Sequence, residues 1–189
     1  MIDPRALATA ELRSGETLLW SGQSDPRVLF TGRDAFLVPF SVLWCGFIAF
    51  WLTQAISSGA PWFFAVIGSL FALMGLHLLI GRFVVKRRRK LTEAYAVTNR
   101  RAFITNGQRT SETSVGRDDR ETHWSKGRTH CSVEWRGTSG SSSLGFGRTA
   151  NAQQVYANTG LDGFFGPRIV AFWDVPDGEA LMSALERAA

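Results

Sequence analysis

The stretch that decides the fold is AFLVPFSVLWCGFIAFWLTQAISSGAPWFFAVIGSLFALMGLHLLIG, residues 35–81, which contains no Asp, Glu, Lys or Arg. A charged side chain at the centre of a bilayer costs about 2.5–3.5 kcal/mol, so long uncharged runs are typical of membrane spans. The alternative is a buried helical hairpin in a water-soluble core. We favour it less, because a chain of 189 residues has little core in which to bury two helices that are apolar all round.

The run is long enough for two membrane spans. One span needs about 20 apolar residues to cross a hydrocarbon layer of about 30 Å. Residues 35–56 and 62–80 supply the two spans, and the turn formers of Ser57–Pro61 separate them. The sequence therefore predicts a transmembrane helical hairpin over residues 35–81, preceded by an N-terminal segment, residues 1–34.

Basic residues predict the orientation of this hairpin. The loop between the spans is uncharged, whereas a basic linker, residues 82–91, follows the second span. The cationic side chains of this linker are Arg82, Lys86, Arg87, Arg88, Arg89 and Lys90. Because cytoplasmic loops carry an excess of Lys and Arg, we expect both termini in the cytoplasm, with the first span as an uncleaved signal anchor.

The same cluster accounts for the net charge of +5, since residues 92–189 carry equal numbers of acidic and basic groups. A nucleic-acid-binding domain needs a basic face of its own, so we expect no nucleic-acid partner. The six cations have two interpretations. The favoured one is a topology determinant in contact with anionic head groups, worth about 1 kcal/mol per residue. The other is a specific head-group site.

Four small residues form a stripe on the second span: Ala65, Gly68, Ala72 and Gly75. Small residues let helices approach closely in lipid. We favour packing within the hairpin, against Gly46 and Ala49, over a homo-oligomeric interface. His77 is the one ionisable group in the spans, and a proton-handling role is the less favoured interpretation because the spans contain no acidic partner.

Residues 92–189 are long enough for one small domain, and their local patterns are mostly those of β-strands. The predicted strands are Glu93–Val97, Arg101–Thr105, His130–Arg136, Ser143–Phe146 and Ile169–Val175. Asp177 is a predicted cap for a final helix over Glu179–Ala189. The polar stretch Asn106–Arg128 and the Gly- and Ser-rich stretch Gly137–Gly147 are predicted to be irregular loops.

Four segments, in order along the chain, resemble the bacterial membrane proteins that carry a pleckstrin-homology-like (PH-like) domain after a two-helix hairpin. They are Gly15–Gln23, the hairpin ending in Gly81-Arg82-Phe83, Tyr95–Arg101 (YAVTNRR), and Gly163-Phe164-Phe165 before the last strand and helix. The resemblance implies an α+β membrane protein of the bacterial inner membrane. Its domain would be a strongly bent sheet or barrel of about seven strands with a C-terminal helix. The resemblance is one of fold, so no lipid specificity is carried over.

No catalytic or metal site is predicted. His123, His130 and Cys131 lack the paired ligand spacing of a zinc site, and neighbouring strand residues such as His130 and Cys131 point to opposite faces. The acidic pair Asp118-Asp119 is interpreted as solvated surface. We therefore expect no cofactor and no enzymatic activity.

The sequence predicts a membrane-anchored PH-like module that binds a protein or a lipid at the inner face of the membrane. The alternative is an accessory or pore-forming subunit of a membrane complex, assembled through the small-residue stripe of the hairpin. The expected partners are the lipid bilayer and a protein that the sequence does not identify.

Overall fold

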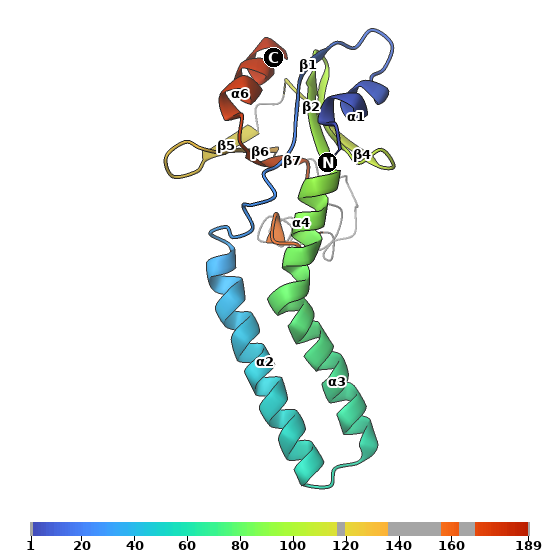
Figure 1. Ribbon diagram of the computed structural model, residues 1–189, viewed down its shortest axis with the longest axis vertical. Helices are drawn as coiled ribbons and strands as arrows, with labels where there is room; N and C mark the ends of the chain where they lie inside the picture. Colours follow the sequence, from blue (N-terminus) through green and yellow to red (C-terminus); the bar gives the residue numbers. More distant parts are fainter. Residues whose placement is uncertain (1, 117–119, 136–155, 163–168, 189) are drawn as a thin grey trace, which may run out of the picture.

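The computed structural model describes residues 2–116, 120–135, 156–162 and 169–188. It is an α+β structure with two long apolar helices and two small antiparallel sheets. Figure 1 shows the helical hairpin projecting from one side of a domain that contains both sheets and both ends of the chain.

The hairpin consists of α2 (Asp34–Ser57) and α3 (Trp62–Leu76). Both helices are long and apolar enough to cross a membrane, by length and composition. After α3 the helix continues through a π-helical turn, η1 (His77–Gly81), into α4 (Arg82–Thr92). The basic linker of residues 82–91 is thus helical, and one continuous helix connects the hairpin to the domain.

The first sheet has the strand order β1-β2-β3-β4. Its strands are β1 (Leu18–Gly22), β2 (Ala94–Thr98), β3 (Arg101–Thr105) and β4 (Thr110–Ser114). Strand β1 precedes the hairpin in the sequence, yet it pairs with β2, with Ser21 opposite Ala96. Because its other three strands follow the hairpin, this sheet is assembled from both sides of it, and β1 of the N-terminal segment packs on the chain that follows α4.

The second sheet has the order β5-β6-β7. Its strands are β5 (Arg120–Trp124), β6 (Cys131–Trp135) and β7 (Ala171–Val175). Strands β4 and β5 lie within Asn106–Arg128, so the prediction of an irregular loop there was wrong. The polar sequence of β4 misled the prediction: only Thr113 of this strand is buried, and pairing with β3 supplies its backbone partners.

The hydrophobic core lies between the two sheets and under α6 (Gly178–Ala188). Phe172 is at its centre, stacked on Tyr95 at 4.8 Å and edge-on to Trp135 at 5.1 Å between ring centroids. From α6, Leu181 and Leu185 are fully buried in the same core. On another face of the first sheet, α1 (Pro4–Ala10) packs Ala8 against Phe103 and Ala96.

Most of the predicted elements are present, with small shifts at their ends. The strand Arg101–Thr105 is confirmed, and the predicted strand Ile169–Val175 begins two residues later, at Ala171. The C-terminal helix is also confirmed. The predicted strand Ser143–Phe146 and the stretch Gly137–Gly147 lie outside the described residues.

Candidate functional site at the base of the hairpin

Three cations of α4 turn inward, toward the domain. Arg82, Lys86 and Lys90 are spaced four residues apart, so they lie on one face of the helix. All three side chains are buried, with exposed fractions of 0%, 3% and 4%. Burial of a charge is costly unless the charge is paired, so the partners of these cations define the candidate site.

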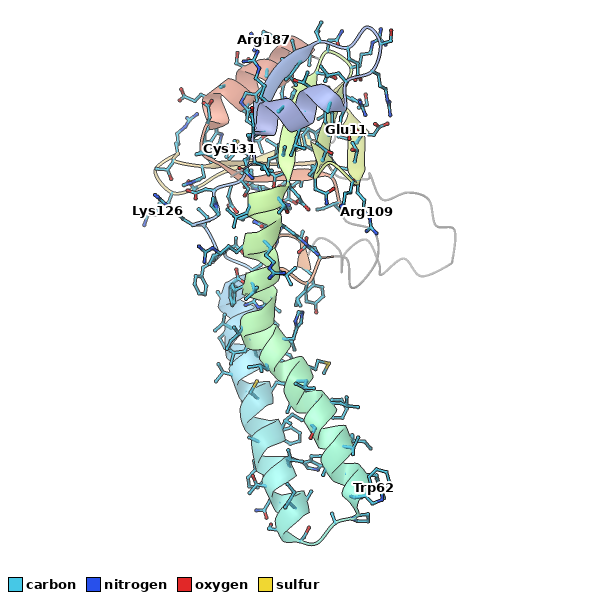
Figure 2. All side chains as sticks on the ribbon, turned by 45° about the vertical axis from the view of Figure 1, so that its right-hand side comes forward. Glu11, Trp62, Arg109, Lys126, Cys131 and Arg187 are labelled. Carbon is cyan, nitrogen blue, oxygen red and sulfur yellow. The ribbon has the colours of Figure 1, made fainter. Side chains whose placement is uncertain are left out.

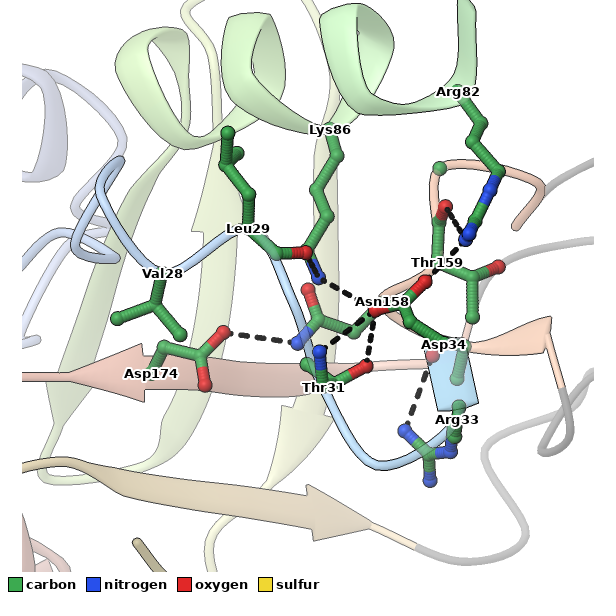
Figure 3. A network of polar contacts seen from close by, with 12 residues as sticks. Val28, Leu29, Thr31, Arg33, Asp34, Arg82, Lys86, Asn158, Thr159 and Asp174 are labelled. Atoms are coloured by element: carbon green, nitrogen blue, oxygen red, sulfur yellow. Dashed lines mark hydrogen bonds and ion pairs between the residues drawn. The ribbon is translucent and has the colours of Figure 1, made fainter. Parts of the chain in front are cut away.

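Asp34, the first residue of α2, is the partner of the cation nearest the hairpin. Its carboxylate forms an ion pair with Arg82 and lies 3.8 Å from the Nζ atom of Lys86. The same carboxylate accepts hydrogen bonds from the backbone N–H and the hydroxyl of Thr31, at 2.7 and 2.9 Å. Figure 3 shows these contacts converging at the start of α2. One buried carboxylate therefore serves two buried cations.

The two lysines are surrounded by the segment that leads from β1 to α2. Lys86 donates a hydrogen bond to the carbonyl of Leu29 at 2.6 Å. Lys90 donates to the carbonyls of Val28 and Asp25, and to the carboxylate of Asp174 on β7 at 2.6 Å. These bonds attach α4 both to the segment before the hairpin and to the second sheet.

A second segment, residues 156–162, closes the site from another side. Its Thr159 carbonyl accepts a hydrogen bond from Arg82, and its Asp162 carboxylate pairs with Arg89. Gly160 has φ of +84°, and a Cβ atom there would lie 2.0 Å from the carbonyl oxygen of Arg82. Only glycine fits this backbone conformation at such close approach. The segment therefore lies directly against the α4 backbone.

The inner face of α4 carries more positive charge than the surrounding carboxylates neutralise. Burial lowers the pKa of Lys86 to about 8, despite the opposing attraction of Asp34, and the positive charge of Lys90 lowers it further. Burial also lowers the pKa of Lys90. The Nη2 atom of Arg82 is buried without a hydrogen-bond acceptor among the described residues. The unpaired Nη2 atom, together with the single carboxylate that Arg82 and Lys86 share, indicates that the protein groups incompletely neutralise the inner face of α4.

A pocket lies between this face of α4 and the domain, partly open to solvent, with a cavity volume of about 60 Å³. Lys86, Arg89 and Lys90 form its α4 wall, and Arg109 lines it from the turn between β3 and β4. Aromatic and apolar side chains also line it; Tyr95, Ile104, Tyr156, Leu161 and Trp173 are among them. The rest of the lining includes the acidic residues Glu93 and Asp162 and several neutral polar side chains. The pocket combines cationic groups with an apolar surface.

The six cations predicted to contact lipid head groups therefore divide into two sets. Arg82, Lys86 and Lys90 are buried against the protein, and Arg89 is half-buried beside Asp162. Only Arg87 and Arg88 have exposed side chains. The helical structure of this segment separates the sets, because one side of α4 faces the domain and the opposite side faces the surroundings.

The small-residue stripe divides in a similar way. Gly68 and Gly75 are buried against α2. A Cβ atom at Gly68 would lie 2.6 Å from Leu52 Cδ1, and a Cβ atom at Gly75 would lie 2.9 Å from Cys45 Sγ. Ala65 is half-buried and Ala72 exposed. The expected facing residues Gly46 and Ala49 are both exposed, and a Cβ atom at Gly46 would meet nothing within 4 Å. That part of the packing prediction was wrong, since larger side chains of α2, not its small ones, cover the glycines.

The histidines and the domain cysteine do not converge. His130 lies 3.1 Å from the carboxylate of Asp25, and His123 lies 3.2 Å from that of Glu121. Cys131 is fully buried in the core, and burial raises the pKa of its thiol. Within the described part of the chain, no group of three His, Cys, Asp or Glu side chains is arranged to hold a metal ion. His77 begins the π-helical turn, and its ring lies over Gly81.

Sequence reasoning did not identify the anionic half of the site. Asp34, Asp174 and the backbone carbonyls of residues 25–29 were not predicted to contact α4. One signal was present: Asp34 immediately precedes the uncharged run and Arg82 immediately follows it. Two antiparallel helices joined by a short loop bring such flanking residues together.

Comparisons with protein-family models, curated proteins and solved structures found no match to this chain. The function is therefore inferred from the geometry of the molecule itself, and the PH-like assignment stays a prediction.

Proposed function

We propose that this is an integral membrane protein whose hairpin anchors a non-catalytic PH-like binding domain at the cytoplasmic face of the membrane. The first support is the apolar surface of the hairpin. Large hydrophobic side chains are exposed along both helices; among them are Phe36, Leu43, Phe47, Phe50, Leu70 and Leu73. A contiguous apolar surface of this extent is unfavourable in water and ordinary in lipid.

The dimensions and ends of the hairpin fit a bilayer. Helix α2 has 24 residues, which corresponds to about 36 Å at 1.5 Å per residue, enough to cross a hydrocarbon layer of about 30 Å. At the far end of the hairpin Trp62 is 78% exposed, and at the domain end Phe30 is 69% exposed beside Phe83. Figure 2 shows Trp62 at the tip of the hairpin. Aromatic rings at both ends are typical of the two membrane interfaces.

The observation that carries the proposal is the continuity between hairpin and domain. The second hairpin helix enters the domain without a break, and buried ion pairs join α4 to the start of α2 and to β7 of the second sheet. A domain attached in this way keeps one orientation relative to the membrane. We infer that the protein's task is to hold a binding surface at a fixed position near the inner membrane surface.

The second candidate, an accessory or pore-forming subunit of a membrane complex, has less support. It was motivated by the small-residue stripe, and two of its four residues, Gly68 and Gly75, contact α2 of the same chain. What remains for contact with another helix is the exposed surface around Gly46, Ala49 and Ala72. Such a surface also fits lipid.

Membrane insertion and orientation are tested with an impermeant maleimide on intact and permeabilised cells. Ser58→Cys in the hairpin loop should react on intact cells, and Lys126→Cys in the domain only after permeabilisation. Both positions are exposed in the structure. The unmodified chain is the control for background labelling of Cys45 and Cys131. Recovery of a monodisperse protein in the soluble fraction without detergent would rule out the proposal.

The two candidates are separated by photo-crosslinking from two exposed positions of the full chain. A crosslinking residue at Ser114 on β4 reports partners of the domain, and one at Phe50 on α2 reports partners within the membrane. A protein captured from Ser114 but not from Phe50 supports a binding domain. Capture from Phe50 alone supports the membrane-complex subunit. The full chain is needed, because removal of residues 92–189 would leave β1 without its neighbouring strand.

A further inference from the structure

The pocket beside α4 lies where the domain meets the hairpin, and its walls come from distant parts of the chain. One wall is α4, with Lys86, Arg89 and Lys90, and another is the turn between β3 and β4, with Arg109. Figure 2 shows Arg109 at the edge of the domain nearest the hairpin. We propose that this pocket, which we call the α4 pocket, binds the phosphate group of a small anion or of a lipid head group.

The first argument is the supply of hydrogen-bond donors. Arg109 has an exposed side chain, and no carboxylate contacts it among the described residues. Its guanidinium group is therefore available for a ligand, and planar guanidinium groups bind phosphate oxygens in pairs. Arg89 lies on the α4 side of the same pocket, beside Asp162.

The second argument is the shortage of negative charge around α4. Asp34 is shared between Arg82 and Lys86, and the Nη2 atom of Arg82 has no acceptor among the described residues. An anion in the α4 pocket would interact favourably with Lys86 and Lys90 without displacing their present partners.

The third argument is the size and lining of the pocket. Its volume of about 60 Å³ is several times the roughly 10–15 Å³ that a single water occupies by the same kind of measure. Trp173, Tyr156 and Leu161 supply apolar surface next to the cations. A ligand with an anionic group and an apolar or ring portion matches this lining better than a bare metal ion does, because the four cationic residues of the lining outnumber its two acidic ones, Glu93 and Asp162.

The position of the pocket allows two sources of phosphate. Arg89 is seven residues beyond Arg82, which corresponds to about 10 Å along the helix. The head-group layer adds about 5–8 Å to each side of the hydrocarbon core, so the pocket opens at its outer boundary. A lipid head group and a soluble phosphate compound both reach this height. The lipid source rests on the proposed membrane location, whereas binding of soluble phosphate does not.

The test uses the full chain in nanodiscs made only of phosphatidylcholine. The melting temperature is measured at increasing concentrations of inorganic phosphate. Sodium chloride at matched ionic strength is the control for screening. In the second arm, nanodiscs that contain phosphatidate replace the added phosphate. The probe variants are Arg109→Gln, which removes the charge, and Arg109→Lys, which keeps the charge but loses the paired donors. The matched control is Arg88→Gln, an exposed cation of α4 that does not line the pocket.

The original chain and Arg88→Gln should show a saturable rise in melting temperature with phosphate. Arg109→Gln should bind phosphate about tenfold more weakly or worse, since one charge-assisted interaction is lost. The phosphate affinity of Arg109→Lys should lie between that of the original chain and that of Arg109→Gln. Without ligand all four should melt alike, which shows that the variants are folded. An effect confined to phosphatidate would identify the lipid as the source, and an effect of free phosphate would persist even if the membrane location is wrong. If Arg109 has no influence in either arm, the proposal is overturned.

Discussion

Asp34 and Arg82 form a buried ion pair across the base of the hairpin, although 48 residues separate them in the chain. One begins α2 and the other begins α4, after the π-helical turn that follows the second apolar helix. The pair therefore joins the two ends of the hairpin where they enter the domain. Two further residues contact the same pair: Thr159, from the segment after β6, and Lys86, from the next turn of α4.

Breaking this pair should destabilise the protein strongly. Arg82→Gln or Asp34→Asn alone should reduce the free energy of unfolding by about 3–5 kcal/mol, because each leaves an uncompensated buried charge. The double variant should lose less than the sum of the two, since neither charge remains. Thermal unfolding in detergent measures all three, with Arg88→Gln as the exposed control. Strictly additive losses would show that the two side chains do not interact.

Gly160 should tolerate no side chain. Gly160→Ala places a methyl group against the Arg82 carbonyl and requires an unfavourable positive φ. Gly59→Ala is the matched control, because Gly59 also has positive φ but open space around it. The control should cost about 1 kcal/mol from backbone strain alone. Protease cleavage near residues 156–162 should rise for Gly160→Ala only, and equal effects of the two changes would argue against the close contact.

A cysteine in place of Gly75 should form a disulfide with Cys45 of the same chain. The Cβ position of Gly75 lies 2.9 Å from the Cys45 sulfur, within the geometry of a disulfide. Mild oxidation should give a monomer with altered electrophoretic mobility. Ala72→Cys, which is exposed on α3, is the control and should not react with Cys45 in the same chain. A crosslinked dimer of Gly75→Cys would instead support the homo-oligomeric interface.

Acid should weaken the attachment of the N-terminal segment to the first sheet. A hydrogen bond from Arg101 lowers the pKa of Glu16, whose side chain is 2% exposed. Because the pKa of Glu16 is lower in the folded protein than the 4.5 of the unfolded chain, its carboxylate stabilises the fold at pH values above 4.5. This stabilisation is lost as the pH falls through the pKa of the folded state. The melting temperature should therefore fall below about pH 4.5, and Glu16→Gln should make that dependence shallower. An unchanged dependence would exclude Glu16 as a cause.

Raising the pH above about 8 should at first stabilise the protein. The pKa of Lys86 is about 8 in the folded protein, against 10.5 for a free lysine, because the side chain is buried. Between these values the unfolded chain binds more protons than the folded one, so stability should rise with pH. Burial raises the pKa of Tyr95, so stability should fall again once the unfolded tyrosine ionises near pH 10.

Lys86→Met should remove the rise between about pH 8 and 10 and leave the fall above pH 10. Lys90 faces the same site, and its pKa is also lowered by burial. Arg82, Asp34 and Asp174 are the other charges that act on Lys86. Melting curves of both proteins at closely spaced pH values measure the difference. A rise that persists in Lys86→Met would assign it to Lys90.

Local patterns predicted the elements that depend on neighbouring residues. The uncharged run predicted two helices because its length and its lack of charged residues can be read directly from the sequence. The strand Arg101–Thr105 and the C-terminal helix were predicted from alternation, turn residues and a cap. Strand β4 was missed because polar composition says little about an edge strand, whose backbone bonds come from its neighbour.

The sequence by itself determined that this chain has a long apolar hairpin, where its cations cluster, and that β-structure and a final helix follow. Only the tertiary structure decided that β1 pairs with β2 across the hairpin, and that Arg82, Lys86 and Lys90 face the domain while Arg87 and Arg88 do not. The reason is physical. Helix and strand formation depend on contacts between near neighbours, whereas the partner of a charge depends on which distant segment packs beside it.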